Sequence, residues 1–193
     1  MNTGKKLIGI LGIHGSREEH AEAMQKLGFE IIFLREKEDY SEISGIILPG
    51  GESSSFGRLL EWTDTRQVLE QKILKEKIPV FGTCAGAILL AKKGSEYSLG
   101  AIDIDIDRNA YGRQIDSFSD EIDLAGESQK FHGLFIRAPK IVKIGESVEV
   151  LANYDGCPVL VLDKAQNILV STFHPELTSD TRIHEIFAET MTK

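Results

Sequence analysis

Residues 77 to 91 read Lys77-Ile-Pro-Val-Phe-Gly-Thr-Cys-Ala-Gly-Ala-Ile-Leu-Leu-Ala91. The centre of this stretch, Gly82 to Gly86, has the form G-x-nucleophile-x-G, in which two glycines permit a tight strand-to-helix turn. The turn predicts an exposed Cys84 side chain at the carboxyl edge of a sheet, where a helix N-terminus favours the reactive thiolate. The N–H of Ala85 would be free to bind a developing oxyanion. On this pentapeptide alone, a small core cysteine in a Gly-rich turn remains an equal alternative.

Strands and helices alternate around this turn in the first half of the chain. We expect strands at Leu7–Ile13, Glu30–Leu34, Ile46–Leu48 and Val80–Phe81, and helices from Ser16 to about Leu27, over Phe56–Glu61, Thr65–Lys75 and Ala85–Lys92. The segment Ser16-Arg-Glu-Glu19 looks like a capping box that opens the first helix. Such alternation implies right-handed crossovers and a mostly parallel sheet that is covered on both faces.

The second half of the chain is richer in strand patterns. Ile102, Ile104 and Ile106 alternate with aspartates, which is the period-2 pattern of a half-exposed strand. Further strands, several of them antiparallel, are expected near Phe131–Ile136, Val148–Leu151, Pro158–Leu162 and Ile168–Phe173, and an amphipathic helix follows Ser179. No repeat or linker divides the chain. We therefore predict one α/β domain over residues 1–193, a three-layer, flavodoxin-like fold with a mostly parallel central sheet, helices on both faces and antiparallel strands in the second half.

The composition excludes several classes of protein. The 193 residues carry a formal net charge of −8, which argues against a duplex nucleic-acid binder. The early apolar run Leu7–Ile13 is too short to span a membrane and resembles no signal peptide. Two cysteines, Cys84 and Cys157, cannot form a disulfide framework, so a reducing cytoplasm is the simpler expectation. No Cys/His cluster suits zinc, so we expect no metal site.

A cysteine nucleophile needs a base, and that base needs an acceptor to orient it. His174-Pro-Glu176 supplies both, because residues i and i+2 of an extended segment point the same way and Pro175 favours extended geometry before it. His20 and His184 fall in helical patterns where solvated or partner-facing roles are commoner, and His132 lies beside Gly133 in an expected turn.

A second Gly-rich turn, Pro49-Gly-Gly-Glu-Ser-Ser54, follows an expected strand and precedes a helix. It lacks the spacing of a dinucleotide or Walker motif, so nucleotide binding is a poor fit. Beside a cysteine turn it becomes a candidate second arm of an oxyanion hole.

Together these segments resemble the class I, or triad, glutamine amidotransferases, and most specifically the glutaminase subunits of pyridoxal 5′-phosphate synthases. The resemblance spans essentially the whole chain in the expected order. It rests on Ile8-Gly-Ile-Leu-Gly-Ile-His-Gly15, Arg17-Glu-Glu-His20, Leu48-Pro-Gly-Gly-Glu-Ser53, Gly82-Thr-Cys-Ala-Gly86, Arg108-Asn-Ala-Tyr-Gly-Arg-Gln-Ile-Asp-Ser-Phe118, Phe135-Ile-Arg-Ala-Pro139 and Phe173-His-Pro-Glu-Leu177.

The resemblance implies roles for individual residues. Cys84 is the expected nucleophile, with His174 and Glu176 completing the triad. Gly51 and Ala85 are the expected oxyanion donors, and Gly51, Glu52, Ser53, Arg108, Ile136 and Arg137 are the expected glutamine-binding residues. A guanidinium suits the α-carboxylate of glutamine, although position alone does not choose among Arg108, Arg113 and Arg137.

The resemblance also implies an activity and a partner. The chain would hydrolyse L-glutamine to L-glutamate and ammonia without a cofactor, and a separate (β/α)8-barrel synthase subunit would use the ammonia to make pyridoxal 5′-phosphate (vitamin B6) from ribose 5-phosphate and glyceraldehyde 3-phosphate. The expected complex holds twelve copies of each subunit, docked on the helix after His14, which stands where the family has glutamine. The alternatives are a glutaminase of another amidotransferase and a catalytically silent regulatory subunit.

Overall fold

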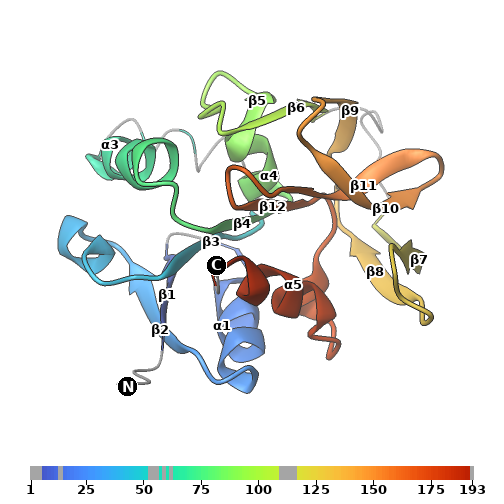
Figure 1. Cartoon of the computed structure of the whole chain (residues 1–193), viewed down its shortest axis with the longest axis horizontal. Coiled ribbons are helices and arrows are strands. Elements are labelled where there is room, and N and C mark those ends of the chain that lie inside the picture. Colours follow the sequence, from blue (N-terminus) through green and yellow to red (C-terminus); the bar gives the residue numbers. More distant parts are fainter. Residues whose placement is uncertain are drawn as a thin grey trace.

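The fold is a three-layer α/β sandwich (Figure 1). The computed structural model describes residues 6–12, 15–51, 57, 60, 63–108 and 117–191. Helices α1 (Arg17–Lys26) and α5 (Arg182–Thr190) cover one face of the central sheet, and α3 (Thr65–Glu70) and α4 (Ala85–Leu90) cover the other (Figure 1). Shorter helical segments are η1 (Lys37–Tyr40), η2 (Gln71–Lys75) and η3 (Pro175–Leu177). Within the described residues, no helix is long and apolar enough to cross a membrane.

The central sheet has nine strands in the order β2-β1-β3-β4-β12-β11-β10-β7-β8. The strands are β1 (Leu7–Leu11), β2 (Glu30–Leu34), β3 (Gly45–Leu48), β4 (Val80–Thr83), β7 (Phe118–Leu124), β8 (Phe131–Phe135), β10 (Glu149–Tyr154), β11 (Cys157–Asp163) and β12 (Ile168–Ser171). The pairings from β2 to β12 are parallel, and those from β12 to β8 are antiparallel. The order β2-β1-β3-β4 begins as in flavodoxin-like sheets, so the predicted fold class is confirmed.

The parallel strands are buried on both faces because each face carries a helical layer. Val80 packs into the cluster under α3 and α4, whereas its neighbour Phe81 packs with Met24 of α1 and Phe187 of α5. This alternation places successive side chains of β4 in opposite cores. It therefore also sends Thr83, two residues after Phe81, toward α1 and α5.

A second, smaller sheet has three strands, β5 (Ala91–Lys93), β6 (Ile102–Asp107) and β9 (Lys140–Ile144). The isoleucines of β6 are buried and its aspartates are more exposed, as their alternation predicts. Between β10 and β11, Asp155 and Gly156 both have positive φ, which is the geometry of a two-residue hairpin turn.

Several sequence-based boundaries were wrong. The helix predicted to Lys92 ends at Leu90, because the next residues form β5 and pair with β6. The helix predicted over Thr65–Lys75 changes to π-helical geometry at Gln71. Strands β7 and β9 were not anticipated. Most of the predicted helix Phe56–Glu61 lies outside the described residues.

Candidate active site

Cys84 lies in the turn between β4 and α4, in a backbone conformation that side chains rarely adopt. Its φ of 47° and ψ of −100° make it one of five non-glycine residues of the described chain with positive φ. Such a conformation costs roughly 1–3 kcal/mol and persists only where the surroundings enforce it. Here the Cys84 N–H donates to the carbonyl of Ser171 on β12 (2.9 Å). The sheet thus holds the strained turn in place.

The Cys84 side chain is more enclosed than its position at the sheet edge predicts. It is 7% exposed, because its sulfur faces the carbonyl oxygen of Ile136 (3.9 Å) and its Cβ approaches Gly50. The prediction of an exposed cysteine was therefore wrong, although its placement at the end of β4 was right.

Three glycines let the backbone close around this cysteine. A Cβ on Gly50 would lie 2.3 Å from Cε1 of His174, and one on Gly86 would lie 2.0 Å from the carbonyl oxygen of Leu48. Gly15, at φ +91°, approaches Gly50 so closely that a Cβ there would lie 1.6 Å from its carbonyl oxygen. The turn after β1, the turn after β3 and the cysteine turn therefore meet with no room for another side chain.

His174 and Glu176 complete a chain of contacts that starts at the sulfur. The His174 ring and the Cys84 side chain both border Gly50 and interact electrostatically, and Nδ1 of His174 lies 2.7 Å from Oε1 of Glu176. The predicted contact is present, but the predicted extended segment was wrong, because Pro175–Leu177 is a short 3₁₀ helix. The ring of Phe173 packs against Phe131 and Phe135 and so anchors the residue just before the histidine.

The groups around His174 favour its protonated form. Burial lowers the pKa of His174, but hydrogen bonds and charge interactions with Cys84 and Glu176 raise it to about 10. Burial raises the pKa of Glu176, whereas His20, His174 and the Ser16 hydroxyl lower it to about 2. A protonated His174 beside an ionised Glu176 is therefore the stable arrangement at neutral pH.

The Ser16 side chain hydrogen-bonds to Glu176 and does not cap α1. It occupies the N-cap of α1 as predicted, but its hydroxyl makes no capping bond and donates instead to Oε1 of Glu176 (2.5 Å). The capping-box prediction was therefore wrong in its bonding. A carboxylate near the first turn of a helix also interacts favourably with the helix dipole.

His20 and His184 were judged peripheral from the sequence, and this prediction was wrong. Both are fully buried, and Nδ1 of His20 lies 2.9 Å from Nε2 of His184. Nε2 of His20 lies 3.1 Å from the hydroxyl of Thr83 and 3.5 Å from Oε2 of Glu176. Their helical spacing indicated a face but not its direction, since α1 and α5 converge only in the folded chain (Figure 1).

The expected substrate residues lie partly within reach of the sulfur. Ala85 begins α4, so its N–H has no acceptor within the helix, and Gly51 follows Gly50 in the adjoining turn. Ile136 brings its carbonyl to Cys84. Glu52, Ser53, His14 and Arg113 lie outside the described residues.

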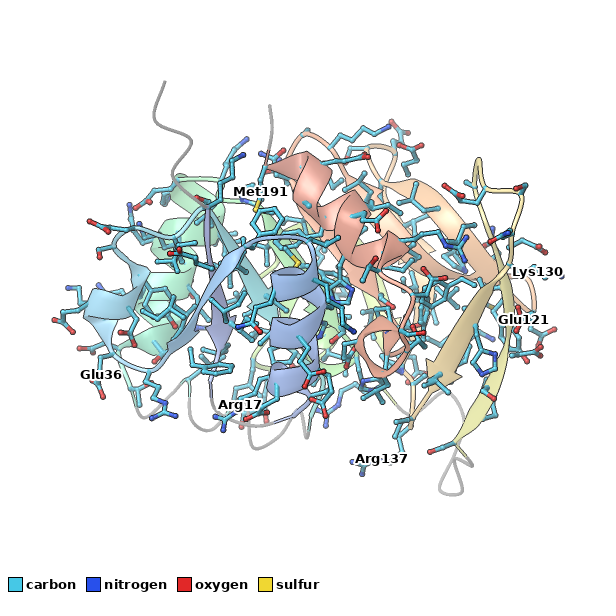
Figure 2. The ribbon with its side chains drawn as sticks, turned by 90° about the horizontal axis from the view of Figure 1, so that it is seen from below. Arg17, Glu36, Glu121, Lys130, Arg137 and Met191 are labelled. Carbon is cyan, nitrogen blue, oxygen red and sulfur yellow. The ribbon has the colours of Figure 1, made fainter. Side chains whose placement is uncertain are left out.

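Two guanidinium groups remain as candidates for the substrate carboxylate. Arg137 is exposed, has φ of 44° and adjoins Ile136, and it lies at the same edge of the molecule as Arg17 in Figure 2. Arg108 follows β6 in the smaller sheet and is half-buried. Within the described part of the chain, neither has a hydrogen-bond or ion-pair partner. The structure therefore brings Arg137 next to the site more directly than Arg108.

No group of three or more His, Cys, Asp or Glu side chains suited to a metal occurs among the described residues. His132, the remaining described histidine, lies on β8 rather than in a turn and pairs with Glu121 on the surface. Cys157 begins β11 and is half-buried.

Comparison with known proteins gives a consistent family. The model of the SNO glutamine amidotransferase family matches residues 10–193. Pyridoxal 5′-phosphate synthase subunit PdxT of Thermosipho africanus is 49% identical over 189 residues, which cover 96% of this chain and 99% of that protein. The protein of the same name from Thermotoga petrophila is 50% identical over 186 residues, covering 94% and 97%.

Solved structures agree with this assignment. A crystal structure described as a glutamine amidotransferase has a TM-score of 0.87 and 39% identity and covers 96% of this chain and 99% of its own. The structure of PurLQS from Thermotoga maritima, with a TM-score of 0.69 and 18% identity over 97% of this chain and 96% of its own, shares the fold. Since the family model spans nearly all of the sequence and full-length relatives reach 50% identity, the chain belongs to the SNO glutamine amidotransferase family.

Proposed function

We propose that residues 1–193 form a single glutaminase domain that hydrolyses L-glutamine to L-glutamate and ammonia. The observation that carries this proposal is the contact chain from the strained Cys84 through His174 to Glu176. It supplies a nucleophile, a base and an orienting carboxylate, which are the three roles that acyl transfer requires. The intact set argues against a catalytically silent role.

In the first half-reaction, the Cys84 sulfur attacks the carboxamide carbon of glutamine and forms a C–S bond. The oxyanion that develops is proposed to be held by the N–H groups of Gly51, in the turn after β3, and Ala85, at the start of α4. His174 then donates its proton to the amide nitrogen, so that the C–N bond breaks and ammonia leaves. A glutamyl thioester on Cys84 remains.

In the second half-reaction, water attacks the thioester while His174 accepts a proton from it. The C–S bond breaks, glutamate is released, and the proton returns the pair to its starting state. Glu176 stays ionised throughout and stabilises the imidazolium whenever it forms. Glu52, Ser53, Arg108, Ile136 and Arg137 are proposed to bind the amino-acid end of the substrate, with a guanidinium on its α-carboxylate.

The ammonia is proposed to pass to a separate pyridoxal 5′-phosphate synthase subunit in the cytoplasm. The names of the full-length relatives support this partner, because each is a subunit of that synthase. We propose that α1 provides the docking face and that the complex contains twelve copies of each subunit. A glutaminase of another amidotransferase is the alternative.

The test measures glutamate release from glutamine by the chain alone and with the synthase subunit. Cys84→Ala should lower the rate by several orders of magnitude, since removing a covalent nucleophile removes the route itself. Cys157→Ala is the matched control, because this second free cysteine lies on β11, outside the contact chain, and should leave the rate unchanged.

The outcomes separate the alternatives. Glutamate release that survives Cys84→Ala contradicts the thioester route. No release in any mixture favours a silent regulatory subunit. Release without transfer of ¹⁵N from amide-labelled glutamine into pyridoxal 5′-phosphate, in a mixture that contains the synthase, assigns the chain to another amidotransferase.

A further inference from the structure

A pair of buried histidines lies directly behind the candidate triad. His20 of α1 and His184 of α5 are both 0% exposed, and their rings pack edge-to-face against each other and against Phe81. The mechanism above uses neither ring. Two fully buried imidazoles beside a carboxylate that carries charge need a physical account, because buried polar groups are nearly always satisfied.

Both oxygens of Glu176 face α1, but they are not equally satisfied. Oε1 accepts hydrogen bonds from Ser16 and His174. Oε2 is buried and has no hydrogen-bond partner among the described residues, and His20 Nε2 lies 3.5 Å from it. Ser16 and His20 are four residues apart, so the first turn of α1 reaches both oxygens of one carboxylate.

The arrangement of neighbours determines where the ring protons lie. If His20 carried its proton on Nδ1, its Nε2 lone pair would face the Glu176 carboxylate, and His184 would leave an N–H at its buried Nδ1, which has no partner in the described part of the chain. If His20 carries its proton on Nε2, that N–H faces Thr83 and Oε2, and its Nδ1 accepts from His184 Nε2. In that arrangement only the Nδ1 lone pair of His184 lacks a partner among the described residues, and a buried unpaired acceptor costs less free energy than a buried unpaired N–H.

We propose that His184 and His20 form a neutral, directional hydrogen-bond chain, in which His184 fixes the tautomer of His20 so that its Nε2–H orients and stabilises Glu176. Both histidines are thus positioning residues, since neither touches the substrate or the sulfur. This inference rests on the proposed glutaminase function for its kinetic consequences but not for the tautomers themselves.

The neutral state of the pair agrees with its surroundings. Burial lowers the pKa of His20, and burial together with His20 lowers the pKa of His184 to about 3. The titratable groups that face His20 are Glu176, His174 and His184 from the neighbouring elements and Glu19 on α1 itself. The N–H of a neutral imidazole can stabilise the carboxylate without adding a second buried cation.

The first test reads the tautomers in the unmodified protein. Long-range ¹H–¹⁵N correlation spectra of the histidine rings distinguish Nδ1–H, Nε2–H and doubly protonated forms. We expect His20 and His184 to be neutral Nε2–H tautomers at pH 7, with assignments made from His20→Gln and His184→Gln. A neutral Nδ1–H tautomer or an imidazolium at His20 overturns the proposal, whether or not the chain proves to be a glutaminase.

The second test uses two amides at one position. In His20→Gln the side-chain amide reaches the site of Nε2 and can still donate toward Thr83 and Glu176, whereas in His20→Asn it reaches only the site of Nδ1. We expect kcat to fall about tenfold in His20→Asn at unchanged KM, as for loss of one hydrogen bond to a charged group, and to stay within about threefold in His20→Gln. Equal losses in both variants overturn the proposal.

The third test separates positioning from a merely structural role. The rate at which iodoacetamide alkylates Cys84 is measured against pH in a Cys157→Ser background, so that one thiol reports. Weakening Glu176 destabilises the imidazolium, so the acid limb of this profile should move to higher pH in His20→Asn and remain in place in His20→Gln. His184→Leu should shift it in the same direction, with no further shift in the double variant with His20→Asn. Unchanged acid limbs in folded variants refute the inference.

Discussion

Lowering the pH should destabilise the fold because His184 is buried, and the loss in the free energy of unfolding follows from the pKa of this ring. The ring is buried on α5 against Phe81 and His20, and burial is the main cause that lowers its pKa to about 3. In the unfolded chain the same ring has its ordinary pKa of 6.5. Between about pH 6.5 and pH 3 the ring is therefore protonated in the unfolded state and neutral in the folded state, so the free energy of unfolding falls as the pH drops.

The expected size follows from this difference. At pH 5 the native ring is still neutral, while the unfolded ring is 1.5 units below its pKa of 6.5. At 1.36 kcal/mol per unit, the penalty relative to neutral pH is about 2 kcal/mol. His174 works in the opposite direction in this window, because its raised pKa favours the folded, protonated state. The contribution of His174 is common to the wild type and to a variant at position 184, so it cancels in their difference.

The assay is urea denaturation of the wild type and of His184→Gln at pH 7 and pH 5. His184→Gln removes the titration but keeps an amide near Nε2, so its loss of stability between the two pH values should be about 2 kcal/mol smaller than that of the wild type. His132→Gln is the control, since this histidine is exposed on β8. Equal pH dependence in the wild type and His184→Gln refutes the burial argument.

Three further predictions concern the site itself. Gly50→Ala should abolish glutaminase activity, because its Cβ would lie 2.3 Å from Cε1 of His174. Gly28→Ala strains the backbone at φ +87° but its Cβ meets nothing within 4 Å, so it should lose stability and keep activity in the folded protein; equal activity of the two folded variants contradicts the packing around Gly50. Ser16→Ala should lower kcat about tenfold at unchanged KM through loss of its hydrogen bond to Glu176. The kcat/KM profile should fall on its alkaline side near pH 10, where His174 loses its proton; an alkaline midpoint near pH 7 contradicts this. The raised pKa of His174 also stabilises the fold fully below pH 6.5, and this stabilisation should be lost as the pH rises to about 10.

The sequence was most informative where local pattern and tertiary environment agree. The apolar runs of β1, β3 and β4 are buried on both faces, and their β-branched composition predicted them within a few residues. Strand β7, with the sequence Phe-Ser-Asp-Glu-Ile-Asp-Leu, was missed because its exposed face is acidic and its pairing with β8 and β10 is non-local. Similarly, Ala91-Lys-Lys93 continues an Ala-rich helical pattern, but pairing with β6 overrides that propensity.

The residues of the candidate site likewise differ in how far the sequence alone could predict their roles. Cys84, His174 and Glu176 could be singled out because each belongs to a short motif whose chemistry is readable in isolation. The roles of Ser16, His20 and His184 could not, because they depend on which carboxylate a helix meets after folding. A serine before two glutamates is an ordinary capping signal, and only the position of Glu176 diverts its hydroxyl.

The free energies of the two possible Ser16 hydrogen bonds explain why its hydroxyl contacts Glu176. The first turn of α1 lacks a capping bond, which is typically worth about 1 kcal/mol, and the Ser16 hydroxyl donates to the Glu176 carboxylate instead. A hydrogen bond to a buried, charged carboxylate contributes more than one to a helix end, since water can satisfy the unpaired N–H groups of a solvent-accessible helix end. Any displacement of α1 would therefore withdraw Ser16 and His20 from Glu176 together and weaken the imidazolium that Glu176 supports. The geometry of the candidate triad therefore depends on the position of α1 as well as on the motif residues.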